Sequence, residues 1–180
     1  GVVRMNCVSR RDFVGNALFP VFSMATLSHA LATGSASLSR VEARYYEKLP
    51  HKKVRCKLCP RECVIDDRER GYCGVRENSG GTYYTLVYSR PCSLHADPIE
   101  KKPLFHFLPG TLAFSLATAG CNVNCRFCQN WEISQVRPEQ VRNAEVPPER
   151  VAELAKKYDC HSIAYTYSEP VVFYEYVFDS

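Results

Sequence analysis

The order of apolar segments between residues 111 and 180 constrains the fold more than any other feature of the sequence. "TLAFSLATAG" (111–120) predicts a buried strand, and "VPPERVAELAKKY" (146–158) predicts a helix with prolines in its first turn. "HSIAYTYSEP" (161–170) predicts a second buried strand, ended by Pro170, and "VVFYEYVFDS" (171–180) predicts a further helix. Strand, helix, strand, helix implies parallel strands joined by right-handed crossovers, so we predict an α/β fold.

These units are too few to complete a barrel. A (β/α) barrel takes about 250 residues, whereas residues 111–180 number 70. The last helix would also leave four aromatic side chains with little to pack against: Phe173, Tyr174, Tyr176 and Phe178. We therefore expect the N-terminal part of a partial, TIM-like (β/α) barrel, in a chain truncated from a longer enzyme.

The ten cysteines are distributed unevenly. Four lie between Cys56 and Cys73, and three lie between Cys121 and Cys128. Short gaps of two and three residues let thiolates converge on one metal centre, so the spacing favours metal ligands over disulfides. An exported protein that pairs its cysteines as disulfides is the alternative.

The first cluster has the spacing C-x2-C-x3-C-x9-C and consists of Cys56, Cys59, Cys63 and Cys73. Four thiolates close a tetrahedral site, which indicates a structural or electron-transfer role. Zinc and a second iron–sulfur cluster both satisfy this spacing, and the identity of the metal stays open. Cys92 is a substitute for one of the four ligands, whereas an isolated cysteine such as Cys160 is more often a small buried apolar residue.

The second cluster, Cys121, Cys125 and Cys128, has the spacing C-x3-C-x2-C and directly follows the first predicted barrel strand. Three thiolates can hold three irons of a 4Fe-4S cluster, and the fourth iron is then open to a substrate. S-adenosylmethionine (SAM) can chelate such an iron, and one electron from the cluster then cleaves its carbon–sulfur bond to give a 5′-deoxyadenosyl radical. The alternative is a zinc site completed by a distant ligand such as Cys160 or His161.

C-x3-C-x2-C with Phe127 just before the third cysteine resembles the radical SAM superfamily. "GCNVNCRFCQNWEIS", "DPIEKKPLFHFLPG" and "CKLCPRECVI" are similar to one branch, the radical enzymes of the AmmeMemoRadiSam system, related to pyruvate formate-lyase-activating enzymes. The resemblance runs from about Glu42 to the C-terminus. It implies a partial (β/α) barrel, a 4Fe-4S cluster on the three cysteines, bound SAM, and an electron donor such as flavodoxin or ferredoxin.

The same resemblance implies hydrogen abstraction from an unidentified protein or small-molecule substrate, with a glycyl-radical activase as one version. In such enzymes the end of the second strand holds the amino group of SAM, which here points to Thr166, Ser168 and Glu169. An ammonium group needs hydrogen-bond acceptors, although Glu169 is equally well explained as a cap of the following helix. Phe127 is expected near the adenine. Lys101 and Lys102 are expected either to meet an anionic group or to form a solvated pair.

The first 35 residues resemble an export signal. Arg10, Arg11 and Phe13 form a twin-arginine-like motif before a mildly apolar stretch and small residues. We expect export to the periplasm or membrane surface; the alternative is an N-terminal arm of a cytoplasmic protein. The expected organisation is therefore a signal segment (1–35), a helix over 38–50 with the cysteine-rich module and a connecting loop (36–110), and the first barrel units (111–180).

Composition limits the other function classes. The 180 residues carry a net charge of only +4, without a basic stripe interleaved with aromatics, so no nucleic-acid partner is expected. No apolar run after residue 35 is long enough to span a membrane. The main alternative to an enzyme is a zinc-binding interaction module without catalysis.

Overall fold

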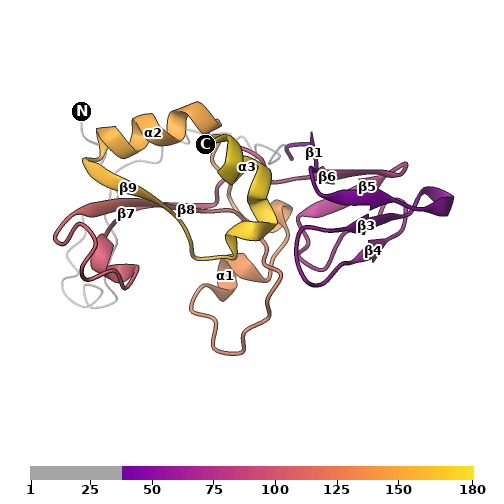
Figure 1. The fold of residues 1–180 in the computed structure, drawn as a ribbon, viewed down its shortest axis with the longest axis horizontal. Helices are drawn as coiled ribbons and strands as arrows, with labels where there is room; N and C mark the ends of the chain where they lie inside the picture. The colour runs from indigo at the N-terminus through magenta and orange to yellow at the C-terminus, as the bar shows by residue number, and fades with distance from the viewer. Residues whose placement is uncertain (1–37) are drawn as a thin grey trace, which may run out of the picture. The chain divides into compact units, whose positions relative to one another are not determined.

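The largest sheet lies in the C-terminal half of the chain. The computed structural model describes residues 38–180. In this sheet the central strand is β8 (Leu112–Ala117), with β7 (Ser93–Pro98) on one side and β9 (Cys160–Tyr165) on the other (Figure 1). β9 runs parallel to β8, and α2 (Pro148–Lys157) forms the crossover between them. The predicted parallel strand–helix–strand unit is therefore confirmed.

β7 pairs with β8 in the antiparallel direction, from Ser93 opposite Ala117 to Pro98 opposite Leu112. This strand lies in the segment expected to connect the cysteine-rich module to the barrel units. The three strands do not close into a barrel within residues 38–180. The structure is thus a mixed α/β fold with a three-stranded sheet at the place where the barrel units were expected.

Alternation along β8 gives the sheet two different faces, because successive side chains of a strand point to opposite sides. Phe114 and Leu116 face α2 and pack with Val151 and Ala155 of that helix. Ser115 is fully buried, and His95 lies opposite it on β7. One face is therefore apolar and covered by α2, and the other carries polar groups.

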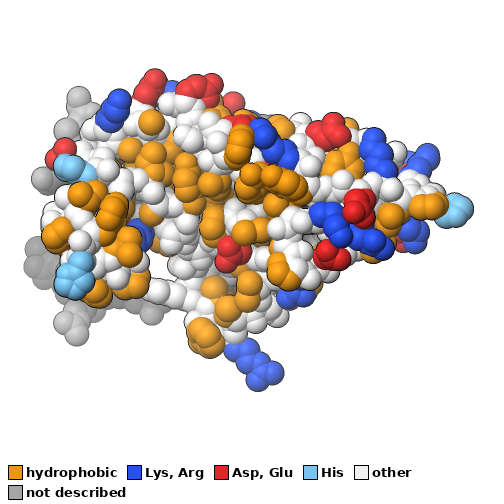
Figure 2. Space-filling model, in the orientation of Figure 1, with side chains coloured by type: hydrophobic (Ala, Val, Ile, Leu, Met, Phe, Trp, Pro, Cys, Tyr) orange, Lys and Arg blue, Asp and Glu red, His pale blue; other side chains and the backbone are white. Residues whose placement is uncertain are grey.

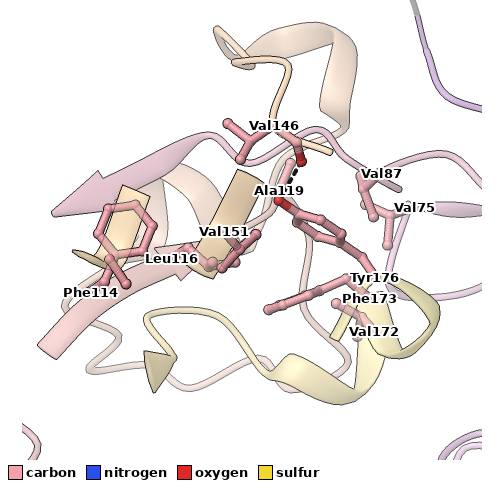
Figure 3. Close-up of a cluster of buried hydrophobic side chains, with 11 residues drawn as sticks. Val75, Val87, Phe114, Leu116, Ala119, Val146, Val151, Val172, Phe173 and Tyr176 are labelled. Atoms are coloured by element: carbon pink, nitrogen blue, oxygen red, sulfur yellow. Dashed lines mark hydrogen bonds between the residues drawn. The ribbon is translucent and has the colours of Figure 1, made fainter. Parts of the chain in front are cut away.

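The main hydrophobic core extends from this apolar face to the end of the chain (Figure 3). The last elements are η4 (Pro170–Phe173), a 3-10 turn, and α3 (Tyr174–Asp179). Phe173 and Tyr176 are both 1% exposed, and the Tyr176 hydroxyl donates to the Val146 carbonyl at 2.6 Å. The expectation that these two rings would lack packing was wrong. Phe178, in contrast, is 60% exposed.

The N-terminal part contains two small antiparallel sheets. One has the order β1 (Val41–Glu42), β6 (Thr82–Thr85), β5 (Arg76–Ser79), and the other β2 (Tyr46–Lys48), β3 (Val54–Cys56), β4 (Val64–Ile65). The helix expected over 38–50 was wrong. Residues of this segment pair as β1 and β2 instead, because pairing with β6 and β3 overrides a weak local helix preference.

Short elements complete the described chain. They are η1 (Pro50–Lys52), η2 (Ile99–Lys101), α1 (Trp131–Ser134) and η3 (Pro138–Gln140). A second apolar cluster lies between the small sheets, formed by Ala43, Val54, Cys56, Ile65 and Tyr83. On the face shown in Figure 2, Lys and Arg side chains are interspersed with Asp and Glu side chains around β3–β5.

A buried ion pair connects the small sheets to the end of the chain. Arg76 of β5 and Glu175 of α3 have side chains 2% and 1% exposed, and the two are paired. Arg76 Nε also donates to the Val172 carbonyl at 3.1 Å. Within residues 38–180 no helix is long and apolar enough to cross a membrane. The expected signal segment lies outside the described residues.

Candidate functional site

The three-cysteine loop begins where β8 ends. Cys121 and Cys128 are half-buried, and Cys125 is exposed. The Cys128 amide donates to the Cys125 carbonyl at 3.2 Å, which forms a tight turn between these two residues. The loop therefore presents its three thiols at the carboxyl end of the central strand, the edge at which barrel enzymes carry their active sites.

Gly120 fixes the start of this loop. Its φ is +82°, which favours glycine, and its amide donates to the Ile133 carbonyl at 2.8 Å. A Cβ at this position would lie 2.5 Å from both the Cys73 carbonyl oxygen and a methyl carbon of Val75. The loop thus packs directly against the chain around Cys73, and only glycine fits at the contact.

The short helix α1 supports the loop from the other side. The Ser134 hydroxyl lies 3.3 Å from the Cys128 sulfur, and the side-chain amide of Gln135 donates to the Val123 carbonyl at 2.9 Å. The Val123 amide lies 3.5 Å from the Cys121 sulfur. Two polar groups therefore already contact the sulfurs of Cys121 and Cys128, and such hydrogen bonds tune metal–thiolate centres.

The cysteines of the loop are free thiols. Within residues 38–180, no three Cys, His, Asp or Glu side chains are grouped tightly enough to enclose a metal ion as they stand. Three thiols on eight consecutive residues fit a cluster that keeps one iron open. Binding would require the three side chains to turn toward a common centre.

The end of β9 lies next to this loop. The Asn130 side chain donates to the Tyr167 carbonyl at 3.1 Å, which joins the two segments. An open cavity of about 430 Å³ is lined here by Asn130, Thr166 and Tyr167, together with Lys101 and Lys102. Its volume lies within the range of small-molecule sites, about 300–1,000 Å³.

The predicted residues at the end of β9 have different environments. Thr166 lines the cavity, whereas the Ser168 hydroxyl is buried and donates to the Thr118 carbonyl at 2.9 Å. Glu169 precedes η4, but its side chain makes no capping hydrogen bond. Glu169 therefore makes no side-chain hydrogen bond to this turn, and both its place at the helix start, favoured by the dipole, and its assignment to SAM stay predictions.

Two further expectations concern aromatic and charged groups. The Phe127 ring is 91% exposed and does not line the cavity, so its place near an adenine stays a prediction. Lys101 remains solvated, with its side chain 55% exposed, whereas Lys102 does not. Both bind Asp97, at 2.9 and 2.7 Å, and the Lys102 side chain is only 10% exposed.

Asp97 lies at the centre of a cluster of polar side chains that the sequence did not predict. Besides the two lysines, it accepts a hydrogen bond from the Tyr167 hydroxyl. Burial alone would raise the pKa of Asp97, but hydrogen bonds from Lys102, Tyr167 and Lys101 outweigh burial and hold the pKa well below its usual range. Burial and the bond to Asp97 raise the pKa of Tyr167 to about 12. Asp97 and Tyr167 are 70 residues apart, and no local pattern links them.

The four cysteines of the first cluster come together around one small cavity, lined by Cys56, Cys59, Cys63 and Cys73. Burial raises the pKa of the Cys73 thiol to about 11. Cys92 does not line this cavity. It packs against the main core, and its Sγ lies 3.7 Å from the Ala117 carbonyl oxygen. Cys160 is half-buried against the same core, at the start of β9.

Comparison with known proteins identifies the segment that begins in β8 and includes the three-cysteine loop. Residues 115–179 match the radical SAM superfamily. The match supports a radical SAM function for this segment, and the family implies a 4Fe-4S cluster and SAM as cofactors. The matching segment contains Cys121, Cys125 and Cys128 as well as the end of β9. The zinc-module alternative is not favoured by this match.

Two curated relatives come from Methanocaldococcus jannaschii. The uncharacterized protein MJ0808 is 52% identical over 139 residues, which are 77% of this chain and 42% of the relative. The uncharacterized protein MJ0674 is 32% identical over 102 residues, 56% of this chain and 25% of the relative. The chain thus spans less than half the length of these relatives. No solved structure matches it significantly.

Proposed function

We propose that the chain carries the cluster-binding and SAM-binding part of a radical SAM enzyme. The observation that carries the proposal is the three-thiol loop at the carboxyl end of β8, within the segment that matches the superfamily. When bound, a 4Fe-4S cluster with one open iron supplies the electron that cleaves SAM reductively to a 5′-deoxyadenosyl radical, which abstracts hydrogen from a substrate.

In this proposal Cys121, Cys125 and Cys128 are the ligands of the cluster. Cys125 is exposed, so the loop is accessible for cluster assembly. The Ser134 hydroxyl contacts the Cys128 sulfur and would stabilise the charge of a metal-bound thiolate. The hydrogen bond from Asn130 to the Tyr167 carbonyl keeps the loop beside the end of β9.

The end of β9 is proposed to hold SAM. Its ammonium group needs acceptors, and Glu169 has a carboxylate that makes no hydrogen bond or ion pair with the described residues. Thr166 lines the adjacent cavity. The Ser168 hydroxyl donates to the Thr118 carbonyl and so orients the turn that carries Glu169, and its oxygen keeps lone pairs that can accept from the ammonium group.

The finer assignment rests on the sequence motifs. We propose membership of the AmmeMemoRadiSam branch, with an electron donor such as flavodoxin or ferredoxin. The hydrogen donor is a protein or a small molecule, and a glycyl residue of a partner protein is one version of it. The motifs "GCNVNCRFCQNWEIS" and "DPIEKKPLFHFLPG" support the branch.

Electron paramagnetic resonance tests the proposal on the anaerobically reconstituted, dithionite-reduced full-length gene product. We expect a reduced-cluster signal that shifts when SAM is added and disappears in Cys125→Ala. Cys160→Ala is the matched control, because this half-buried cysteine lies at the opposite end of β9 from the loop. It should keep both the signal and the shift.

Glu169→Ala separates the two parts of the proposal. It should keep the cluster signal but weaken the shift caused by SAM, because the carboxylate is assigned to SAM and not to iron. A cluster signal indifferent to SAM in the unmodified protein, or one that survives in Cys125→Ala, contradicts the proposed function.

A further inference from the structure

The four cysteines of the first cluster lie on two turns, the β3–β4 hairpin and a turn around Cys73. Cys56 ends β3, and its amide donates to the Cys63 carbonyl at 2.9 Å, which closes the hairpin before β4. Cys59 lies in the turn between them, and the Glu62 amide donates to its carbonyl at 3.2 Å. The hairpin therefore presents three thiols around one turn.

The fourth cysteine comes from a separate turn. Cys73 lies between Gly71 and Gly74, whose backbones are hydrogen bonded at 2.9 Å, and Gly74 has a φ of +75°. A Cβ at Gly71 would lie 4.0 Å from the Cys73 sulfur and 2.7 Å from the Tyr83 hydroxyl. The turn thus directs Cys73 toward the inside of the module, near the same tyrosine that packs with Cys56.

All four cysteines line a single cavity. Its volume favours one of the two metal centres that the spacing allows, a zinc ion or an iron–sulfur cluster. The cavity measures about 20 Å³. A space of about 10–15 Å³ holds one water-sized sphere, so this cavity has room for one ion. A cubane cluster with four irons and four sulfides does not fit without opening the module. A single divalent ion fits this space once the sulfurs turn inward to about 2.3 Å from it.

We propose that Cys56, Cys59, Cys63 and Cys73 bind a single Zn²⁺ ion in a closed tetrathiolate site. As the structure stands, no three metal-ligating side chains within residues 38–180 enclose a point at ligand distance. Without an ion there is no interaction that brings the four sulfurs to a common point. A bound Zn²⁺ would attract them to ligand distance. The site is independent of the proposed SAM chemistry, because a closed site has no position for a substrate.

The surroundings of the cavity fit a site of net negative charge. Four thiolates around one divalent ion leave two negative charges in excess, and two arginines, Arg61 and Arg76, line the same cavity, the second of them already paired with Glu175. Asn122 also lines it, and its side-chain oxygen is buried without a hydrogen-bond partner among residues 38–180. Turning this amide over places its N–H groups at the same position, where they donate to a metal-bound thiolate.

Asn122 follows Cys121 directly, so the proposed zinc site braces the radical SAM loop. The Asn122 carbonyl accepts a hydrogen bond from Arg61 Nε at 2.5 Å, and the Arg61 guanidinium stacks over the Tyr72 ring at 3.5 Å. Both partners belong to the segment that carries the four cysteines. A metal that fixes this segment therefore also fixes the start of the three-cysteine loop.

The experiment replaces the three loop cysteines by alanine, so that any metal found in the protein is bound outside that loop. The background protein is the full-length triple variant Cys121→Ala/Cys125→Ala/Cys128→Ala, purified anaerobically. Its elemental analysis should give one zinc per chain, with neither iron nor acid-labile sulfide. After exchange with Co²⁺ alone, the absorption spectrum should show sulfur-to-cobalt charge transfer and the visible bands of a tetrahedral tetrathiolate site. These two measurements decide the proposal even if ligand variants do not fold.

Ligand variants then test which thiols bind. Cys59→Ser should bind Co²⁺ at least tenfold more weakly, and Cys59→His should retain binding with a spectrum shifted toward three sulfurs and one nitrogen. Cys92→Ser is the matched control, since Cys92 is also half-buried but outside the cavity, and it should bind as the background does. Iron with sulfide in the background protein, disulfides among these cysteines, or unchanged binding in Cys59→Ser would each overturn the proposal.

Discussion

Replacement of Arg76 by methionine tests the contact that joins the small sheets to the C-terminal helix. Arg76 Nη1 donates to Glu175 Oε1 at 3.1 Å, and Nη2 pairs with the second oxygen. Nε donates to the Val172 carbonyl, also at 3.1 Å. In Arg76→Met the methionine fills much of the same space, but Glu175 keeps only the hydrogen bond from the Arg44 amide, at 2.9 Å.

The expected loss of stability is large because both groups of the pair are buried. The two side chains are 2% and 1% exposed, and breaking a buried pair by removal of one partner costs about 3–5 kcal/mol. That is a large fraction of the total stability of a typical domain, about 5–15 kcal/mol. Arg150→Met is the matched control: Arg150 and Glu153 are each 60% exposed, so we expect less than about 1 kcal/mol.

The effect should depend on pH. Burial alone would raise the pKa of Glu175, but Arg76 outweighs it and lowers the pKa, so the pair's contribution to stability is lost as pH falls through the acid range. In Arg76→Met burial dominates and raises the pKa of Glu175. Ionisation of Glu175 without its partner then lowers the variant's free energy of unfolding further as pH rises. The difference between the two proteins should therefore widen as pH increases above about 4.3, the usual value for glutamate.

Urea unfolding, followed by far-ultraviolet circular dichroism under anaerobic conditions at pH 5 and pH 8, measures both effects. The double variant Arg76→Met/Glu175→Leu should recover most of the loss, because it leaves no unpaired buried charge. A change in Arg76→Met no larger than that in Arg150→Met would refute the reasoning. So would a double variant as unstable as the single one.

Two further predictions concern the surroundings of the three-cysteine loop. Gly110 serves as the reference, since its φ is +77° and a Cβ there would contact nothing. Gly110→Ala should therefore lower the free energy of unfolding by about 1–2 kcal/mol, the backbone cost alone. Gly120→Ala should cost about 1–3 kcal/mol more, since its Cβ would collide with the Cys73 carbonyl; equal losses in thermal or urea unfolding contradict the packing argument. Asp97→Asn should cost about 1.5–3 kcal/mol by leaving Lys102 without its charged partner. The difference in unfolding free energy between the two proteins should shrink as pH falls below about 3.9, the usual pKa of aspartate, because ionised Asp97 then stabilises the unmodified protein less. Urea unfolding at pH 3 and pH 7 checks this.

The elements with a strong local pattern were predictable from the sequence. β8 and α2 follow from an apolar run and from a helical stripe with Pro148 at its start. The three-cysteine loop was also predictable, because its thiols are close in sequence. Each of these features depends on residues within a few positions of one another.

Features that depend on distant pairing were not predictable. Residues 41–48 form strands because β6 and β3 offer partners, and no local pattern shows that. Asp97 meets Tyr167 across 70 residues, and its role is invisible in the motif that contains it. The packing of Phe173 and Tyr176 was underestimated for the same reason, since Val75 and Val87 of the N-terminal part help to cover them.

The pairing of Arg76 with Glu175 also has a consequence for synthesis. The two residues are 99 positions apart, and a ribosome that adds about 5–20 residues per second needs about 5–20 s to make the second after the first. Throughout that interval the Arg76 guanidinium lacks its native partner Glu175, so burying it costs the full desolvation of an unpaired charge. The cysteine-rich segment, although made earlier, therefore completes this buried ion pair only after α3 leaves the ribosome.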